Sequence, residues 1–309
     1  MSDMRCRWSA LVVGAVAIVV AASAIVRADQ RGVGMAAPEL ATTLDRATER
    51  VQDFFTRAQS LVCTETVHVQ PLSYGLSGEG FGRTVESELR LSWTPGEDGE
   101  GATEAQALRQ VVKVNGHKPR ARDRNNCTTP EQHDTETQVL SMLLPGERDG
   151  YTWTLAGEGK VDGRPAVLVD FREKAGITVD VRVVENNDDC ISYDINGGLR
   201  GRVWLDAQSF DVLRMDHRLG GQVEVPMPRE IRRRHGVSPA WTVERLETTY
   251  RFKRMRFADP EETLVLPVSS TSLRITHGAG TPRTRVTTQY RQYRRFLTGG
   301  RVVPGDAPP

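Results

Sequence analysis

From Pro38 onward, apolar residues recur at spacings of three and four. The stripe consists of Leu40, Leu44, Ala47, Val51, Phe54, Ala58 and Leu61. Charged residues, among them Asp45, Arg46 and Glu49, occupy the positions in between. This spacing predicts an amphipathic helix of about six turns over residues 38–60. Because such a helix has one apolar face, it must pack on another element.

After this segment the apolar period changes from 3.6 to 2, which predicts strands. The predicted strands are 62–70, 83–93, 108–116, 151–157, 166–173, 179–185, 200–206, 211–219, 246–257, 263–269, 271–278 and 284–296. A further short helix is predicted at 137–145, and the loop from Val225 to Trp241 is predicted to leave the sheet. So few helical segments cannot supply parallel crossovers. We therefore expect a mainly β (α+β) fold, with a large curved antiparallel sheet or half-barrel and the long N-terminal helix packed across it.

The first residues have the features of an export signal. Arg5 and Arg7 precede an uncharged apolar run over residues 10–26, and small residues end at Ala28. This order predicts a signal peptide at 1–28 and a periplasmic or secreted protein. The alternative is an uncleaved anchor in the inner membrane, because 17 residues is close to the lower limit of roughly 17–25 for a spanning helix.

The rest of the chain divides into three parts. A short tether is expected at 29–36, followed by one β-rich half-barrel-like domain at 37–297. The Gly- and Pro-rich end, 298–309, is expected to be a disordered tail. The formal charge is +1, from 41 Lys+Arg against 40 Asp+Glu. This near-neutral balance lacks the basic character of nucleic-acid-binding proteins, so no nucleic-acid partner is predicted.

Three cysteines follow the predicted signal. Cys63 alternates in phase with Leu61 and Val67, which indicates a buried thiol. Cys127 and Cys190 lie in polar, turn-like contexts where a disulfide could join two loops in an oxidising compartment. We predict a Cys127–Cys190 bridge, while three thiols or a bridge to Cys63 remain open alternatives.

The chain carries few signs of catalytic chemistry. The chain contains no HExxH, CxxC, GxSxG or GK[ST] motif, and its six histidines are not paired at ligand spacing. We therefore predict no enzyme, no cofactor and no metal. If the protein were an enzyme, Glu65 would be the first residue to inspect. It lies on the same strand side as Cys63, and burial would raise its pKa.

Two arginine-rich segments are candidates for contact with a partner or with lipid head groups. Arg232, Arg233 and Arg234 lie together in the Pro-rich loop, and more arginines follow in the last predicted strand. The alternative for that strand is an ordinary solvated face, since its arginines alternate with apolar residues.

One helix cannot cover the apolar face of ten or more strands. A concave sheet with an apolar lining would remain, and such cavities suit acyl chains or apolar peptides. The candidate lining residues are Leu44, Val51, Phe54, Glu65 and Val67. The alternative is a closed core filled by the protein itself.

The segment GRVWLDAQSFDVLR at 201–214 carries a more specific resemblance. Its strand, short turn and second strand resemble a unit of the half-barrel lipoprotein-carrier (LolA/LolB-like) proteins. The mature chain also resembles exported bacterial proteins of unknown function, in which VNGHKPRARDR, SMLLP and this segment occupy similar places. The greater length of this chain and its loop at 226–239 depart from the carrier pattern.

The resemblance implies an incomplete barrel with a helix across its open side and a lipid moiety in an apolar cavity. It adds Trp204 and Leu213 as structural or lining candidates, and it carries over no catalytic residue. The leading hypothesis is thus a non-catalytic envelope protein that binds a hydrophobic ligand, such as a lipid or a lipoprotein acyl chain. The alternative is a structural or protein-interaction module with an envelope protein as partner. Membrane contact is expected to be peripheral unless residues 10–26 stay uncleaved.

Overall fold

The structure is a computed structural model. It describes residues 39–58, 61–95, 102–120, 123, 138–184, 187–258, 260–278, 281–296 and 302–306. The chain divides into two compact units, Met1–Ala37 and Pro38–Pro309, and all described residues belong to the second. The predicted signal at 1–28 and the tether at 29–36 lie outside the described residues, so both stay predictions.

Strands make up most of the described chain. They are β1 (Leu61–Pro71), β2 (Arg83–Pro95), β3 (Ala102–Val114), β4 (Tyr151–Val161), β5 (Arg164–Glu173), β6 (Thr178–Val184), β7 (Asn187–Asn196), β8 (Leu199–Asp206), β9 (Val212–Leu219), β10 (Val223–Pro226), β11 (Ala240–Ala258), β12 (Glu261–His277), β13 (Arg283–Phe296) and β14 (Val302–Asp306). The helical segments are α1 (Leu40–Arg57), the 3₁₀ helix η2 (Gln138–Leu143), α3 (Pro145–Arg148) and α4 (Arg229–His235).

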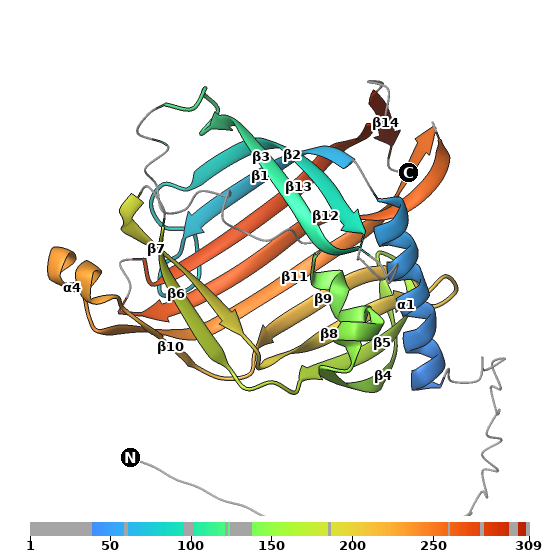
Figure 1. The fold of residues 1–309 in the computed structure, drawn as a ribbon, viewed down its shortest axis with the longest axis horizontal. Helices are drawn as coiled ribbons and strands as arrows, with labels where there is room; N and C mark the ends of the chain where they lie inside the picture. The colour runs from blue at the N-terminus through green and yellow to red at the C-terminus, as the bar shows by residue number, and fades with distance from the viewer. Residues whose placement is uncertain are drawn as a thin grey trace, which may run out of the picture. The chain divides into compact units, whose positions relative to one another are not determined.

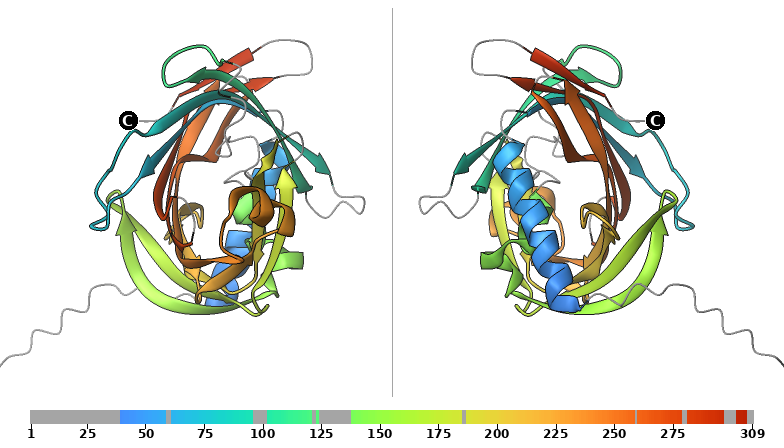
Figure 2. Two further views of the ribbon diagram at one scale, coloured as in Figure 1. Left: turned by 90° about the vertical axis from the view of Figure 1, so that its left-hand side faces the viewer. Right: turned by 90° about the vertical axis from the view of Figure 1, so that its right-hand side faces the viewer.

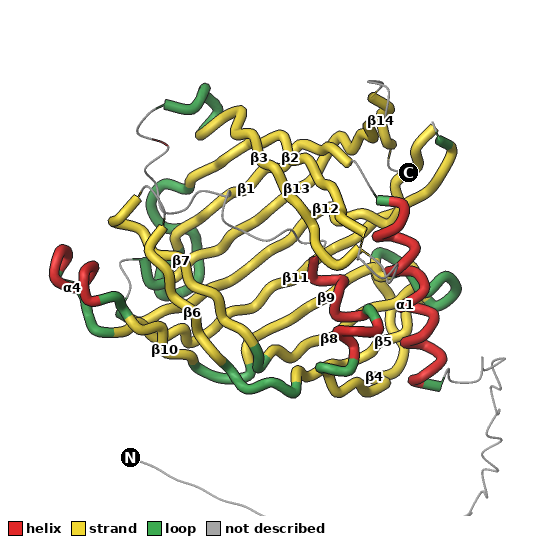
Figure 3. The backbone as a smooth tube through the Cα atoms, in the orientation of Figure 1, coloured by secondary structure: helices red, strands yellow, loops and turns green. Residues whose placement is uncertain are grey.

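Twelve of these strands form one sheet (Figures 1 and 3). Its order is β3-β2-β1-β13-β12-β11-β9-β8-β5-β4, with β10 and β14 paired beside this path. Neighbouring strands are antiparallel, as in the pairs β1–β13, β5–β8 and β8–β9. The described strands β3 and β4 end the path and do not pair with each other, so the sheet does not close. The predicted mainly β fold with a large antiparallel sheet is confirmed.

Helix α1 contacts both edge strands of this open sheet. It contacts β3 and β4, the two end strands, as well as β12 and η2. Figure 2 shows α1 running along one side of the curved sheet. Its buried residues are Thr43, Leu44, Ala47, Thr48, Val51, Phe54 and Phe55. The predicted amphipathic helix is therefore present, and it ends where the Ala58 amide donates to the carbonyl of Phe54 at 2.7 Å.

The main core lies between α1, η2 and one face of the sheet, which we call the inner face. Val203 and Met215 point to this face, and both are completely buried. They pack in one cluster with Leu143 of η2 and with Val51 and Phe55 of α1. Thr48 adds a buried polar contact, since its hydroxyl donates to the carbonyl of Leu143 at 2.7 Å. The apolar stripe of the helix is thus used to fill the inner face at this end.

The hairpin of β6 and β7 covers the other end of the inner face. Val179, Val181, Tyr193 and Ile195 of the hairpin pack on a second cluster that contains Leu219 and Val243. In Figure 1 the hairpin lies toward the left of the sheet and α1 lies at its right. The sequence predicted the strand at 179–185 but interpreted 185–190 as a turn, whereas β7 begins at Asn187. Pairing with β6 outweighs the low strand propensity of the Asn and Asp residues there.

Two predicted strands, 263–269 and 271–278, form the single strand β12. Arg251 pairs with Ser269 and Phe252 pairs with Pro267, so Val268 is an extra residue in the ladder. A proline is tolerated at such a bulge because it has no amide hydrogen to donate. The carbonyl of Pro267 accepts a hydrogen bond of 2.7 Å from the hydroxyl of Tyr293.

Three further segments differ from the pattern-based predictions. Residues 302–306, inside the expected tail, form β14, which pairs with the ends of β11 and β13. The predicted helix at 137–145 is the 3₁₀ helix η2, and α3 begins at Pro145, a residue suited to a first helical turn. The loop after Val225 contains α4, which ends at Gly236 with a φ of 62°.

A buried ion pair ties the end strand β3 to β1. Arg109 Nε lies 2.8 Å from Glu65 Oε2, and its Nη2 lies 3.2 Å from Oε1. The side chains of Arg109 and Glu65 are only 4% and 2% exposed. Both carboxylate oxygens of Glu65 are thus bound by one guanidinium across β2.

We expect Arg109→Met to lower the free energy of unfolding by about 3–5 kcal/mol, because it leaves the buried carboxylate without its cation. The double variant Glu65→Leu/Arg109→Met should recover most of this loss, since it removes both charges. Urea unfolding measures both values. The control is Arg90→Met, whose half-exposed pair with Glu88 should contribute at most about 1 kcal/mol. Equal losses of stability in Arg109→Met and Arg90→Met would contradict the structural role of the buried Glu65–Arg109 pair.

Candidate functional site

The turn between β8 and β9 is organised by Asp206. Its Oδ1 accepts hydrogen bonds from the amides of Gln208 at 3.0 Å and Ser209 at 2.9 Å, and from the Ser209 hydroxyl at 3.1 Å. Its Oδ2 lies 2.5 Å from Arg164. Burial raises the pKa of Asp206, but the hydrogen bonds from Ser209 and Gln208 and the charge of Arg164 bring it below the ordinary value of 3.8. The DAQS sequence at 206–209 therefore folds as an Asx-type turn.

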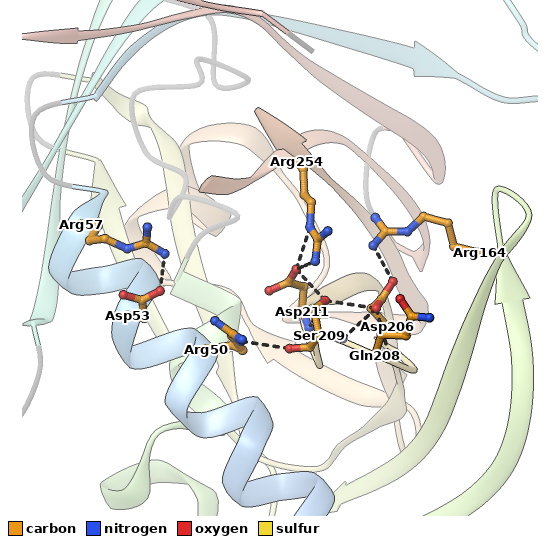
Figure 4. A network of polar contacts seen from close by, with 9 residues as sticks. All are labelled: Arg50, Asp53, Arg57, Arg164, Asp206, Gln208, Ser209, Asp211 and Arg254. Carbon is orange, nitrogen blue, oxygen red and sulfur yellow. Dashed lines mark hydrogen bonds and ion pairs between the residues drawn. The ribbon is translucent and has the colours of Figure 1, made fainter. Parts of the chain in front are cut away.

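Helix α1 docks on this turn through polar contacts (Figure 4). Arg50 Nε donates to the carbonyl oxygen of Ser209 at 2.9 Å. The guanidinium of Arg46 lies 5.0 Å from the ring centroid of Phe210. From the sheet side, Arg254 Nε donates to Asp211 Oδ2 at 2.9 Å. A small cleft of about 260 Å³ lies between the helix and the turn. These contacts hold α1 in place over the inner face.

Three of the predicted lining residues lie together under α1. Leu44, Val51 and Phe54 are 7%, 2% and 6% exposed, and all three belong to the main core cluster. Val67 and Glu65 are buried on β1, where Glu65 binds Arg109. The helix residues thus fill the inner face with the protein's own side chains in this conformation, and ligand access would require α1 to move.

The other two predicted lining residues lie on a different face. Trp204 and Leu213 belong to a small cluster with Val161 and Ala166. Trp204 alternates with Val203 and Leu205, both buried in the main core, so its side chain points to the opposite, outer face. Pattern alone could not assign it because VWL is apolar on both faces. The arginines Arg202 and Arg214 lie 5.8 and 4.6 Å from its ring centroid.

A groove of about 810 Å³ runs beside Trp204 on the outer face, across β4, β5, β8, β9 and β11. Most of its lining residues are polar or charged, among them Thr152, Asp170, Arg200, Asp216 and Arg218. Sequence reasoning missed this groove because the alternation along one strand does not show which residues of other strands lie beside it. The register that places arginines of three strands side by side is a tertiary feature, and no sequence motif indicates it.

His217 lies two residues after Met215 on β9, so its side chain is on the inner face. Burial lowers its pKa to about 4, although the negative charge of Asp216 opposes this shift. Its ring packs edge-on against Tyr250 at a centroid distance of 5.2 Å. The imidazole is therefore neutral at neutral pH. Among the described residues, no group of three or more His, Cys, Asp or Glu side chains could hold a metal ion.

The remaining predicted site residues are placed as follows. Arg232, Arg233 and Arg234 lie on α4, where Arg233 and Arg234 are exposed. Cys63 is completely buried, as the alternation predicted. Cys127 lies outside the described residues, as does the side chain of Cys190, so the predicted disulfide stays a prediction. Within the described part of the chain, no helix has both the length and the apolar content to cross a membrane.

No family model matches this chain, and no curated protein matches it. Solved structures of similar arrangement include a DUF1329 family protein from Desulfovibrio piger, with a TM-score of 0.44, 12% identity and coverage of 85% of this chain and 95% of the other. A domain named for outer membrane lipoprotein sorting, from Vibrio parahaemolyticus, has a TM-score of 0.40, 11% identity and coverage of 84% and 93%. A LolA superfamily protein from Nitrosomonas europaea has a TM-score of 0.34, 6% identity and coverage of 82% and 93%.

One of these structures is named a LolA superfamily protein, the group that the segment at 201–214 resembles. Likenesses at this level carry no argument about what the chain binds, and the functional case therefore depends on its own geometry.

We expect Asp206→Asn to lower the free energy of unfolding at pH 7 by about 1–3 kcal/mol, because it weakens charge-assisted hydrogen bonds. The folded-state pKa of Asp206 is lowered, so its contribution is complete above pH 3.8 and is lost as the pH falls through the lower folded-state value. The difference between variant and wild type should therefore shrink in acid. Urea unfolding at several pH values measures it. Asp180→Asn, at an exposed site, serves as the control and should change stability by less than about 0.5 kcal/mol.

Proposed function

We propose that the protein is a non-catalytic binding protein of the cell envelope. In this proposal the apolar part of a ligand, such as an acyl chain of a lipid or lipoprotein, occupies the inner face of the curved sheet after α1 moves aside. The observation that supports it is the position of α1 against both β3 and β4, the two ends of a sheet that does not close. The export signal predicted from the sequence at 1–28 supports the location in the envelope.

Moving α1 would break no strand pairing. The helix is held to the β8–β9 turn by side-chain contacts such as Arg50 to Ser209, and Arg148 lies 2.8 Å from Asp45. Exposed polar contacts of this kind contribute about 0–1 kcal/mol each. A closed barrel would offer no comparable way in, because opening it would break a whole ladder of backbone hydrogen bonds.

Apolar burial stabilises the closed position of α1 more than these polar contacts do. Leu44, Val51 and Phe54 are each almost completely buried, and each contributes about 1.5–3 kcal/mol to the closed state. The empty protein would therefore stay closed, with its apolar surface away from water. An acyl chain could replace these side chains on the inner face, so the exchange would conserve much of the buried apolar area. This balance suits a carrier that opens only for its ligand.

An alternative function is a protein-interaction module that docks through α4. This short helix presents Arg233 and Arg234 at the surface next to the half-exposed Arg232, with only Ile231 buried. Two exposed arginines beside a half-exposed one suit an acidic protein surface, because electrostatic complementarity steers such encounters.

For the leading proposal, we expect a fluorescent acyl probe to bind the purified protein, and Arg50→Ala to bind it about 2–5-fold more tightly. The reason is that losing the Arg50–Ser209 contact destabilises the closed state and increases the binding-competent fraction. Glu49→Ala is the matched control, because Glu49 is an exposed neighbour on the same helix. Fluorescence titration measures the affinities. Absence of probe binding in both the wild type and Arg50→Ala, with no lipid in an organic extract of the protein, would rule the proposal out.

For the alternative, the triple charge reversal Arg232→Glu/Arg233→Glu/Arg234→Glu should abolish recovery of a protein partner from envelope extracts. The reversal should leave acyl-probe binding unchanged, since α4 lies apart from the core under α1. Pull-down from the same extract with wild type and variant measures the effect. Equal recovery by both proteins would remove α4 as the docking element.

A further inference from the structure

Three arginines lie side by side on the outer face of the sheet. Arg172 of β5 is directly opposite Arg200 of β8, and Arg200 is directly opposite Arg218 of β9. We call these three residues the arginine row. They alternate with inward-facing residues such as Phe171 of the main core, so all three side chains point outward. The row therefore concentrates three positive charges over two strand spacings, about 10 Å.

The neighbouring positions on the same strands show how this sheet normally balances its charges. Arg202 lies between Asp170 and Asp216 in the register and donates to Asp170 at 2.5 and 2.9 Å. Asp216 in turn accepts from Arg214 at 2.9 and 2.6 Å. Opposite charges alternate here, which is the stabilising arrangement for residues that face each other across strands.

The arginine row lacks this compensation. Like charges directly opposite each other destabilise a sheet, and within the described part of the chain these three side chains make no hydrogen bond or ion pair. Arg200 Nε is buried without a partner. The one acid in register is Glu247 of β11, opposite Arg218, but its carboxylate lies 2.6 Å from Arg245. The row thus has spare donors and excess positive charge.

The arginine row borders open space. The groove of about 810 Å³ is lined by all three arginines, and an adjoining pocket of about 220 Å³ is lined by Arg200 and Arg218. Threonine hydroxyls, including those of Thr152 and Thr249, lie along the same groove. An anion that enters can therefore reach the guanidinium groups without any movement of the backbone.

We propose that the arginine row is a binding site for a phosphate group. A carboxylate has two oxygens and is satisfied by a single guanidinium fork, as Glu65 is by Arg109. A phosphate group offers three or four oxygens and more negative charge, so it matches the donors that three neighbouring arginines offer. The group belongs either to a soluble phosphate ester or to a phospholipid head group. The site lies on the face opposite α1 and does not depend on the proposed inner-face function.

The test uses the purified protein with two probes. Calorimetric titration with glycerol 3-phosphate measures binding of a soluble ester, and co-sedimentation with phosphatidylglycerol vesicles measures binding of a head group, with phosphatidylcholine vesicles for comparison. We expect Arg200→Gln and Arg218→Gln each to weaken binding at least tenfold, since each removes a charge-assisted contact. Arg218 is exposed, so its variant tests the site even if Arg200→Gln were to unfold.

Arg182→Gln is the matched control. It removes the same charge from an exposed arginine of β6 that already binds Asp194, and it should leave binding unchanged. Binding of glycerol 3-phosphate that depends on the row identifies a soluble ester, and row-dependent binding of vesicles alone identifies a head group. Failure of both probes to bind, or equal weakening by the control, overturns the proposal. If neither wild type nor Arg50→Ala binds the acyl probe, the inner-face proposal fails, but the phosphate result for the arginine row is unaffected.

Discussion

The structure depends on how an antiparallel sheet that does not close hides its apolar inner face. A closed barrel would bury this face by pairing its last strand with its first. Here β3 and β4 end the sheet, and α1 contacts both of them. The apolar stripe of the helix, including Val51 and Phe55, supplies the missing part of the core. The hydrophobic effect thus fixes the place of α1, and the polar contacts at the β8–β9 turn fix its orientation.

The two faces of β5, β8 and β9 have opposite chemistry because side chains alternate along a strand. Val169, Val203 and Met215 make the inner face dry, whereas Asp170, Arg202 and Asp216 make the outer face a network of charges. Each face therefore suits a different ligand chemistry. The inner face could exchange one apolar surface for another, and the outer face could complete the electrostatic balance of its arginines. An amphiphile with an anionic end combines both properties, although the two sites lie on opposite sides of the sheet.

Buried polar groups mark the places where the fold is most sensitive. Glu65 and Arg109 connect β1 with the end strand β3, which is one of the two strands that α1 contacts. Near the other edge of the sheet, Asp206 holds the β8–β9 turn in shape, and the Ser209 carbonyl of this turn accepts a hydrogen bond from Arg50 of α1. Each carboxylate is held by specific donors in surroundings with little water, where a lost partner is costly. The Asp206 turn therefore contacts α1 directly, whereas the Glu65–Arg109 pair acts on the helix only through the position of β3.

The amino-acid sequence by itself determined the elements whose pattern is local. The 3.6-residue period from Leu40 predicted α1, and the two-residue period predicted most strands and the buried position of Cys63. It could not determine β7 or β14, because β7 begins with Asn and Asp, β14 contains a Pro-Gly pair, and both segments form strands only through pairing with β6 and with β11 and β13. It also could not assign Trp204 to a face, since both of its neighbours are apolar. Only the tertiary structure brought Arg172, Arg200 and Arg218 together, because strand register depends on contacts between segments far apart in the chain.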